Sequence, residues 1–331
     1  MTTGKLRLRA VSGDYDRIRA LKTGEVGIDG CELDYLILSP GETFKRLFRT
    51  HEFDIAEMSF STYMLALSKG DFPYRAIPVF LSRVFPHCSI YVRTDRGIAA
   101  PHDLKGKLVG VPNYHFTRGL VVRGMLQDEY GIKPQDLRWR VGGIDAPDDF
   151  NYVDRPSPPG VHIEFGGDGA CLGEELKDGR LDAIISYRDP QVFVDRAPHI
   201  ARLFPDFRAA EQDWYRRTGV FPAMHVVGIR SALVERHPSL PLSICRAFHE
   251  AKRRCQPQLF DLDALAVSLP WLVAEAEATA RLMGPDFWPY GVAKNRRMIE
   301  AQARWSLEQG LSTVLRPPEE LFITSTLDWD P

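Results

Sequence analysis

The chain has 331 residues, of which 44% are hydrophobic and 26% charged, and its 42 basic and 44 acidic side chains give a net charge of −2. This length predicts two domains or one large domain, while the balanced charge, without any Lys/Arg run, excludes strong electrostatic attraction to nucleic acid. No stretch reaches the roughly 18 consecutive apolar residues of a membrane span, so the expected partner is a small molecule.

The N-terminal residues MTTGKLRLRAVSGDYDRI pass directly into a strand pattern, without the apolar core or cleavage site of a secretory signal. Cysteines stand at positions 31, 88, 171, 245 and 255, an odd number without CxxC spacing. This usage is typical of reduced thiols rather than of disulfides or a zinc site. We therefore expect a cytoplasmic protein.

The first part of the chain alternates short strands with helices. Strands are predicted at 6–11, 31–38 and 53–58, and helices at 12–24, 40–49 and 61–68. Ile18 and Leu21 lie one helical turn apart, and Gly24 can end the first helix. This βαβα order with short connections predicts an α/β layer with a mainly parallel sheet.

Two strand-like runs, at 74–80 and 89–93, then follow without a helix between them. A second α/β series is predicted from a strand at 108–111, a helix at 117–130, a strand at 137–141, a helical turn at 172–177 and a strand at 181–186. The run at 224–230 mirrors that at 89–93 and is expected to pair with it as the chain returns. Helices are predicted at 239–258, 262–283 and 295–309.

This order predicts two α/β lobes with a cleft between them. Lobe I is expected to comprise residues 1–94 and 223–331, including the C-terminal helices. Lobe II is expected to comprise residues 95–222 as an insertion into lobe I.

Polar clusters follow four of the predicted strands. They are SGDY at 12–15, SFSTY at 59–63, NYHFTR at 113–118 and YRD at 187–189. Ligands of open α/β sheets bind beyond the carboxyl ends of the strands, where helices begin and present free N–H groups. The clusters therefore supply candidate ligand-binding residues: Tyr15, Ser59, Ser61, Thr62, Asn113, Thr117, Arg118, Tyr187 and Arg188. Each hydroxyl or amide could also be a simple helix cap.

Several motifs resemble known families. VRTDRGIAAPHDLKGKLVGVPNY, with LQDEYGI and GRLDAIIS after it, resembles the type II periplasmic-binding-protein fold. FLSRVFPHCSIYVR, GVPNYHFTRGLVVRGMLQDEYGI and TGVFPAMHVVGIR resemble the 4,5-dihydroxyphthalate decarboxylase family, which uses this fold as an enzyme inside the cell. The resemblance implies a lyase that converts a hydroxylated aromatic dicarboxylate such as 4,5-dihydroxyphthalate to protocatechuate and CO₂.

Such a substrate needs cationic groups for its carboxylates and a proton donor for its ring. Arg83, Arg118 and Arg188 lie near predicted strand ends, and a guanidinium matches a carboxylate with two parallel hydrogen bonds. Protonation of the ring carbon that bears the departing carboxylate, aided by a para hydroxyl, avoids an aryl carbanion. Histidine suits this acid and base chemistry because its pKa is about 6.5.

We nominate His115 as the ring-carbon acid, with His87 or His225 polarising a phenolic hydroxyl, and these roles are interchangeable. Asp14, Tyr15 and Asp189 are candidates to orient the imidazoles. Alternatively, the three histidines could converge on a divalent metal ion that binds a catecholate. His162 and Glu164 share a face if their segment is a strand, and we interpret them as structural.

No organic cofactor is expected, because neither GxGxxG nor GxxxxGK[ST] occurs. Three other functions fit the same fold: a solute-binding protein for an aromatic or dicarboxylate ligand, a chorismate dehydratase-like lyase, and a cytosolic ligand sensor. The lack of a signal peptide argues against the first, and no helix-turn-helix supports the last. A homo-oligomer formed through the C-terminal helices is compatible with the sequence, although no heptad repeat favours one.

Overall fold

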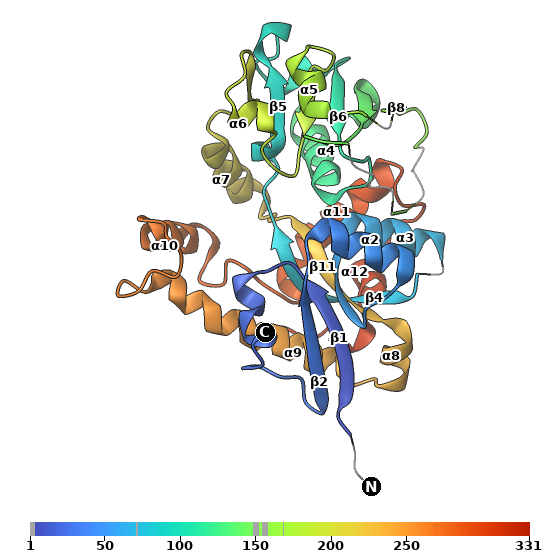
Figure 1. Ribbon diagram of the computed structural model, residues 1–331, viewed down its shortest axis with the longest axis vertical. Coiled ribbons are helices and arrows are strands. Elements are labelled where there is room, and N and C mark those ends of the chain that lie inside the picture. Colours follow the sequence, from blue (N-terminus) through green and yellow to red (C-terminus); the bar gives the residue numbers. More distant parts are fainter. Residues whose placement is uncertain (1–3, 71, 148–151, 154–157, 168) are drawn as a thin grey trace.

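Two α/β lobes make up the molecule, which is a computed structural model that describes residues 4–70, 72–147, 152–153, 158–167 and 169–331. In Figure 1 lobe II lies above lobe I, and the chain passes between them twice, from β4 to β5 and from α7 to β11. The predicted fold class is confirmed.

Lobe I is built on a five-stranded sheet with the order β2-β1-β3-β11-β4. Its strands are β1 (Leu6–Ser12), β2 (Cys31–Ile37), β3 (Ile55–Ser59), β4 (Tyr74–Arg83) and β11 (Ala223–Arg230). The first three strands are parallel, whereas β11 runs antiparallel to both of its neighbours. The carboxyl ends of β1, β2 and β3 therefore meet at one edge.

Lobe II contains a six-stranded sheet with the order β10-β5-β9-β6-β7-β8. Its strands are β5 (Ile90–Arg93), β6 (Leu108–Val111), β7 (Arg138–Val141), β8 (His162–Phe165), β9 (Ala183–Ile185) and β10 (Ile200–Arg202). Strands β9, β6, β7 and β8 are parallel, and β5 runs antiparallel to β9 and β10.

His162 and Glu164 both lie in β8, with His162 Nε2 3.2 Å from Glu164 Oε1, and Glu164 also pairs with Arg138.

Helices connect and cover the strands. Those of lobe I are α1 (Arg19–Lys22), α2 (Pro40–Thr50), α3 (Phe60–Lys69), α8 (Ser231–Arg236), α9 (Leu240–Cys255), α10 (Leu272–Met283), α11 (Arg296–Glu308) and α12 (Pro318–Leu321). Those of lobe II are α4 (Thr117–Tyr130), α5 (Leu172–Lys177), α6 (Gln191–Val194) and α7 (Phe207–Thr218). Helix α11 packs against both α3 and α4, so it joins the two lobes.

The strand pairing at the crossover differs from the expectation. The run at 224–230 does not pair with the run at 89–93. Instead β11 pairs with β3 and β4, and β5 pairs with β9 and β10. Strand β5 therefore belongs to the sheet of lobe II, and the chain leaves lobe I before residue 90 rather than at residue 94.

The predicted helix at 262–283 is also only partly present. Helix α10 begins at Leu272, directly after Pro270 and Trp271. Proline lacks an N–H group and disfavours a helical residue before it, while the Asp261 carboxylate accepts from the Asp263 and Ala264 N–H groups and forms a turn. Leu262, Val267 and Trp271 are exposed as a result.

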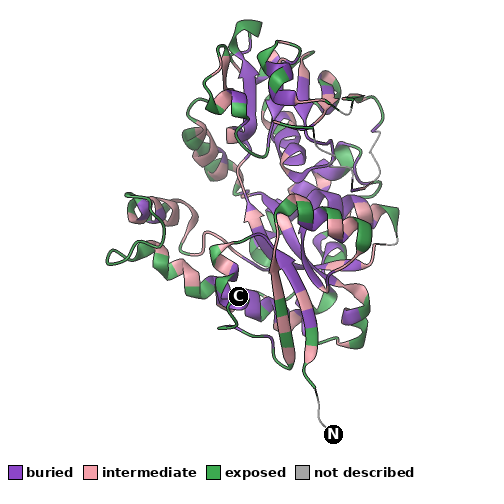
Figure 2. Cartoon of the chain, viewed as in Figure 1, coloured by how far each residue is buried: buried purple, intermediate pink, exposed green. Residues whose placement is uncertain are grey.

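The buried core runs through the sheets and continues across the junction of the lobes (Figure 2). One cluster contains Phe60 and Met64 from lobe I together with Leu120 and Met125 from lobe II. A second cluster lies within lobe I, and a smaller one lies within lobe II. In the described part of the chain, no helix has the length and apolar character needed to cross a membrane.

Candidate active site

A cavity of about 490 Å³ lies between the lobes, within the usual range for small-molecule sites. Part of its wall is formed by residues that follow strands of both sheets, whereas Met224 and His225 come from the beginning of β11. Eight of the predicted site residues line it: Tyr15, Ser59, Asn113, Thr117, Arg118, Tyr187, Arg188 and His225. The rule that open α/β sheets bind ligands beyond their strand ends therefore located this cavity.

A buried carboxylate lies directly behind the cavity wall. Glu57 of β3 is fully buried and accepts hydrogen bonds from His225 Nδ1 at 2.6 Å, the Tyr15 hydroxyl at 2.7 Å and the Gly13 N–H at 2.8 Å. Strands β3 and β11 are neighbours, with His225 opposite Ser59 in the register. The pairing of these strands thus brings the carboxylate to the imidazole.

Glu57 stays ionised in this setting. Burial alone would raise its pKa, but the charge and hydrogen bond of His225, together with the Tyr15 and Gly13 hydrogen bonds, hold the pKa of Glu57 below its usual value. Burial and the neighbouring Glu57 charge raise the pKa of the Tyr15 phenol, which remains a donor. The Glu57 carboxylate fixes the His225 ring and leaves Nε2 as the nitrogen available to a ligand.

Three helices begin at the cavity wall. Ser39 and Pro40 stand at the start of α2, Ser59 caps α3, and Thr117 is the first residue of α4. The N-cap residue of α4, Phe116, makes no side-chain cap hydrogen bond. The first N–H groups of α4 and the positive end of its dipole are therefore suited to an anionic group.

Hydroxyl groups link the beginnings of α3 and α4 across the lobes. Thr117 Oγ1 lies 3.0 Å from Ser59 Oγ and accepts from the Ser61 N–H at 3.1 Å. Ser59 Oγ also lies 2.9 Å from Thr62 Oγ1. Ser61 and Thr62 are buried and do not line the cavity, so their place is in this link. Asn113 lines the cavity, and its buried Oδ1 has no hydrogen-bond partner among the described residues.

Two arginines of lobe II line the cavity and differ in their partners. Arg118 donates to the Tyr187 carbonyl at 3.0 Å and to Ser89 Oγ at 3.5 Å, and it forms no ion pair within the described residues. Burial lowers its pKa, so a nearby anion would be favourable. Arg188, in contrast, is half exposed and pairs with Asp145 at 3.1 Å.

The structure does not bring the other two histidines to the cavity. His115 is buried with both ring nitrogens lacking a hydrogen-bond partner among the described residues, and its ring meets that of Tyr152 edge-on. Burial and the charges of Arg123 and Lys69 lower its pKa to about 3. A neutral, enclosed imidazole is not placed to protonate a ligand in the cavity.

His87 lies in a short turn at 87–89 and packs against Phe204 and Trp214. Burial and Arg217 lower its pKa to about 4. His87, His115 and His225, the residues of the alternative three-histidine metal site, pack in different surroundings. Within the described ranges, no group of three His, Cys, Asp or Glu side chains is arranged to hold a metal ion.

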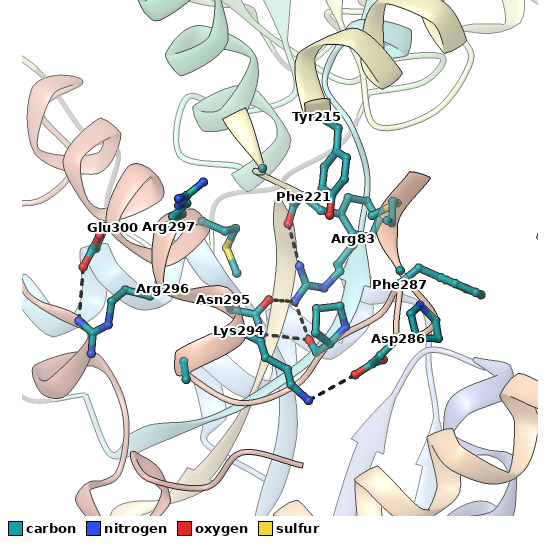
Figure 3. Close-up of a pocket in the computed structure, with 17 residues that line it drawn as sticks. Arg83, Tyr215, Phe221, Asp286, Phe287, Lys294, Asn295, Arg296, Arg297 and Glu300 are labelled. Atoms are coloured by element: carbon teal, nitrogen blue, oxygen red, sulfur yellow. Dashed lines mark hydrogen bonds and ion pairs between the residues drawn. The ribbon is translucent and has the colours of Figure 1, made fainter. Parts of the chain in front are cut away.

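Arg83 faces away from the interlobe cavity. Ser82 lines that cavity, and Arg83, the next residue of β4, lines a different one, shown in Figure 3. Side chains of adjacent strand residues point to opposite faces, and this alternation places the arginine apart from His225.

The residues expected to orient the imidazoles also differ. Asp14 pairs with Lys22, and Asp189 accepts from Arg202 at 2.7 Å and from the Tyr91 hydroxyl. Glu57 orients the His225 imidazole in their place, and the sequence analysis did not identify this residue. The available signal was an acidic residue inside the apolar strand run IAEMS, since a buried carboxylate is rare unless it is paired.

Comparison with known proteins gives the family. No family model matches the chain. The chain is 40% identical over 324 residues to a 4,5-dihydroxyphthalate decarboxylase from Comamonas testosteroni, and the aligned region covers 98% of each chain. The chain is also 41% identical over 212 residues to a 4,5-dihydroxyphthalate decarboxylase from Pseudomonas putida, and the aligned region covers 64% of this chain and 82% of the relative.

Solved structures show the same fold at low sequence identity. The periplasmic aliphatic sulphonate binding protein SsuA from Escherichia coli superposes with a TM-score of 0.53 at 11% identity, covering 98% of this chain and 99% of that one. A DSZB mutant in complex with biphenyl-2-sulfinic acid gives a TM-score of 0.54 at 17% identity, covering 98% of both chains. These likenesses identify the periplasmic-binding-protein fold, and the close relatives show that the chain belongs to the 4,5-dihydroxyphthalate decarboxylase family.

Proposed function

We propose that the protein decarboxylates 4,5-dihydroxyphthalate, with His225 as the group that moves protons. The observation that carries this assignment is the His225 imidazole, which lines the interlobe cavity while the buried Glu57 carboxylate holds its Nδ1 at 2.6 Å. The two relatives named 4,5-dihydroxyphthalate decarboxylase support the choice of substrate.

The cavity offers binding groups for one carboxylate and for the aromatic ring of such a substrate. The free N–H groups at the start of α4 and the Arg118 guanidinium suit the carboxylate that remains. The aromatic side chains of Phe44, Phe116 and Tyr152 lie on the same wall and suit the ring. The departing carboxylate then faces the His225 side of the cavity.

Protonation of the substrate ring allows CO₂ to leave without formation of an aryl carbanion. The doubly protonated His225 imidazole gives its Nε2 proton to the ring carbon that bears the departing carboxylate, and the para hydroxyl, which keeps its proton, stabilises the resulting cationic ring; solvent later returns a proton to His225. The bond to the carboxylate breaks, CO₂ leaves, and the electron pair restores the aromatic ring as 3,4-dihydroxybenzoate. The two halves of 4,5-dihydroxyphthalate are related by symmetry, so loss of either carboxylate gives this product.

Glu57 is a positioning residue in this scheme. Its carboxylate accepts the hydrogen bond from His225 Nδ1–H and stabilises the imidazole while the imidazole carries a positive charge. Tyr15 and the Gly13 N–H bond the same carboxylate and keep it in place. General acid and base catalysis of this kind contributes about 10²–10⁴-fold in rate.

The cytoplasm is the setting that we propose for this reaction. All five cysteines are free thiols, as expected for a protein kept in a reducing compartment.

The test is CO₂ release from 4,5-dihydroxyphthalate by purified protein, with and without prior treatment by a chelator. We expect CO₂ in both preparations, together with 3,4-dihydroxybenzoate. His225→Ala should lower kcat at least about 100-fold, and Glu57→Gln, which keeps the shape of the side chain, should lower kcat with a smaller change in KM. His102→Ala is the matched control, because His102 is exposed beside Asp103.

Each part of the proposal has a result that would contradict it. Binding of 4,5-dihydroxyphthalate without CO₂ release would indicate a binding protein or another substrate. Full activity in His225→Ala would show that His225 is not the group that moves protons. Activity that is lost with the chelator and restored only by added metal would show that a metal ion polarises the substrate.

A further inference from the structure

A second cavity of about 750 Å³ is lined by Arg83 of β4, whereas the adjacent Ser82 lines the interlobe cavity. Its wall combines Tyr215 of α7 in lobe II, Arg83 and Phe221 at the crossover between the lobes, and the segment from Met283 to Glu300 of lobe I. Figure 3 shows Arg83 between Tyr215 and Asn295 within this cavity. The proposed reaction uses none of these residues.

Arg83 is a buried cation with neutral partners. Its side chain donates to the Phe221 carbonyl at 2.7 Å, to the Pro289 carbonyl at 2.8 Å and to Asn295 Oδ1. Its Nε is buried without a hydrogen-bond partner, and no carboxylate of the described residues lies within ion-pair distance of it. Burial lowers the pKa of Arg83 to about 9. A buried charge is normally paired, so the guanidinium lacks a counter-charge.

The acidic residues of this cavity are already engaged elsewhere. Asp286 accepts from Lys252 at 2.6 Å and lies 3.9 Å from Lys294. Glu300 pairs with Arg296 at 3.3 Å.

Arg297, in contrast, is exposed on the same wall and has no hydrogen bond or ion pair within the described ranges. The cavity therefore carries two positive charges, those of Arg83 and Arg297, without matching carboxylates.

Much of the remaining wall is apolar. Phe221, Phe287, Met283 and Met298 line it together with the Tyr215 ring. Phe221 also packs edge-on against the Trp288 ring at 5.4 Å. Aromatic and sulfur-containing side chains bind flat apolar groups well.

We propose that this cavity is a second ligand site, which takes a small molecule with one carboxylate on an aromatic body. The carboxylate lies between Arg83 and Arg297, and the aromatic part contacts Phe221 and Phe287. This site is distinct from the interlobe cavity, and its existence does not depend on the reaction proposed above.

Calorimetric titration of the full-length protein with benzoate tests the site, with neutral benzamide as the second probe. We expect benzoate to bind to the wild-type protein and benzamide not to bind at this site. Arg297→Gln should weaken benzoate binding at least about tenfold, the effect of one charged hydrogen bond. Arg297 is exposed and has no hydrogen bond or ion pair within the described ranges, and Arg83→Gln provides a second variant at the buried end of the cavity.

Two matched variants locate the binding. Arg216→Gln removes an exposed arginine of α7 outside the cavity and should leave benzoate affinity unchanged. Arg118→Gln alters the interlobe cavity and should leave this binding event in place. Absence of benzoate binding, equal affinity in Arg297→Gln and wild type, or loss of binding only in Arg118→Gln would each overturn the proposal.

Discussion

Glu57 and His115 are both buried ionisable residues near the interlobe cavity, yet their surroundings differ. Glu57 receives hydrogen bonds from the His225 imidazole, the Tyr15 hydroxyl and the Gly13 N–H, so its negative charge is stabilised inside the protein. His115 has no such partner among the described residues, and burial favours its neutral form. Glu57 therefore retains a negative charge that orients the His225 imidazole, whereas His115 remains uncharged.

The neutral state of His115 makes stability depend on pH. In the unfolded chain the imidazole binds a proton below about pH 6.5, whereas in the folded protein its pKa is lowered to about 3 by burial, Arg123 and Lys69. The unfolded state therefore binds more protons between these values, and the free energy of unfolding falls as the pH is lowered. We expect His115 to account for a loss of about 2 kcal/mol between pH 7 and pH 5.

Urea unfolding at these two pH values checks the expectation. His115→Leu removes the titrating group and keeps a side chain of similar size. The difference in free energy of unfolding between pH 7 and pH 5 should be smaller in this variant by about 2 kcal/mol, whatever its stability at pH 7. The same difference in both proteins would show that His115 is not kept neutral by the fold.

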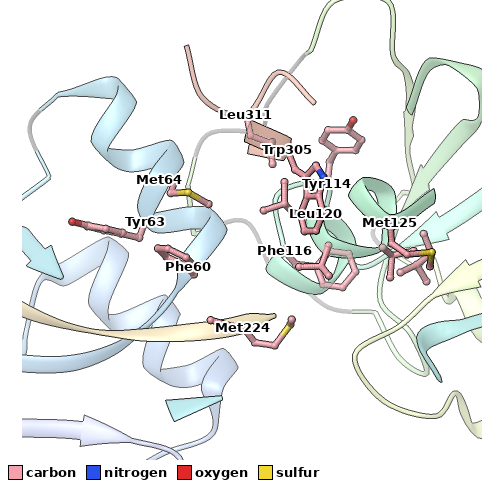
Figure 4. Packing of buried hydrophobic residues seen from close by; sticks show 14 of the residues in the cluster. Phe60, Tyr63, Met64, Tyr114, Phe116, Leu120, Met125, Met224, Trp305 and Leu311 are labelled. Carbon is pink, nitrogen blue, oxygen red and sulfur yellow. The ribbon is translucent and has the colours of Figure 1, made fainter. Parts of the chain in front are cut away.

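At the scale of elements, α4 depends on close contact with α11. Trp305 of α11 belongs to the same buried cluster as Leu120 and Met125 of α4 (Figure 4). A Cβ atom at Gly124 would lie 2.2 Å from the Trp305 ring, so only glycine fits there. Trp305 is held in position by its Nε1–H, which donates to Asp128 at 2.9 Å.

Gly124→Ala is therefore expected to destabilise the protein. Helix propensity alone favours alanine by about 1 kcal/mol, but the forced movement of Trp305 costs about 1–3 kcal/mol or more. We expect a lower midpoint in thermal unfolding. Gly27→Ala, at a position where nothing lies within 4 Å of the added Cβ, is the control and should change little. A more stable Gly124→Ala protein would contradict the close packing of α4 and α11.

Elements with a strong local signal could be predicted from the sequence. The prediction of a helix at 117–130 is confirmed, because an apolar pattern leads to Gly131, which adopts the left-handed conformation that ends a helix. Helix α7 gave no such signal, since only Trp214 among its residues is buried. The exposed segment at 262–271 gave a misleading signal, because its apolar residues do not pack in the core.

The sequence predicts those site residues whose position follows directly from the order of strands and helices. Residues after parallel strands, such as Tyr15, Thr117 and Arg118, do line the cavity. Glu57 lies within a strand, and its contact with His225 depends on the pairing of β3 with β11, which are far apart in sequence. Arg83 was expected at the site, but a difference of one residue along β4 placed it on the opposite face.

At the scale of the whole molecule, the link between the lobes rests partly on one hydroxyl. Thr117 Oγ1 of lobe II accepts from the Ser61 N–H of lobe I and lies 3.0 Å from Ser59 Oγ. Both interactions lie at the wall of the cavity, so they favour the closed arrangement. Binding proteins of this type open and close by hinge motion of their lobes.

Thr117→Val should shift the protein towards a more open arrangement. The change keeps the size of the side chain but leaves the Ser61 N–H without its partner, a loss of about 1–3 kcal/mol for a buried group. We expect a larger radius of gyration in solution scattering without ligand. Thr117→Ser keeps the hydroxyl and should resemble the wild-type protein. An unchanged radius in Thr117→Val would show that other contacts hold the lobes together.

The position of β11 also has a consequence for folding during synthesis. This strand lies between β3 and β4 in the sheet of lobe I, yet residues 84–222, which contain all of lobe II, are synthesised before it. Strand β4 therefore has no neighbour in its sheet until residues 223–230 leave the ribosome, while lobe II can already form its own core. The lobe that is made first is thus completed last, and its apolar strand β4 requires protection from aggregation during that interval.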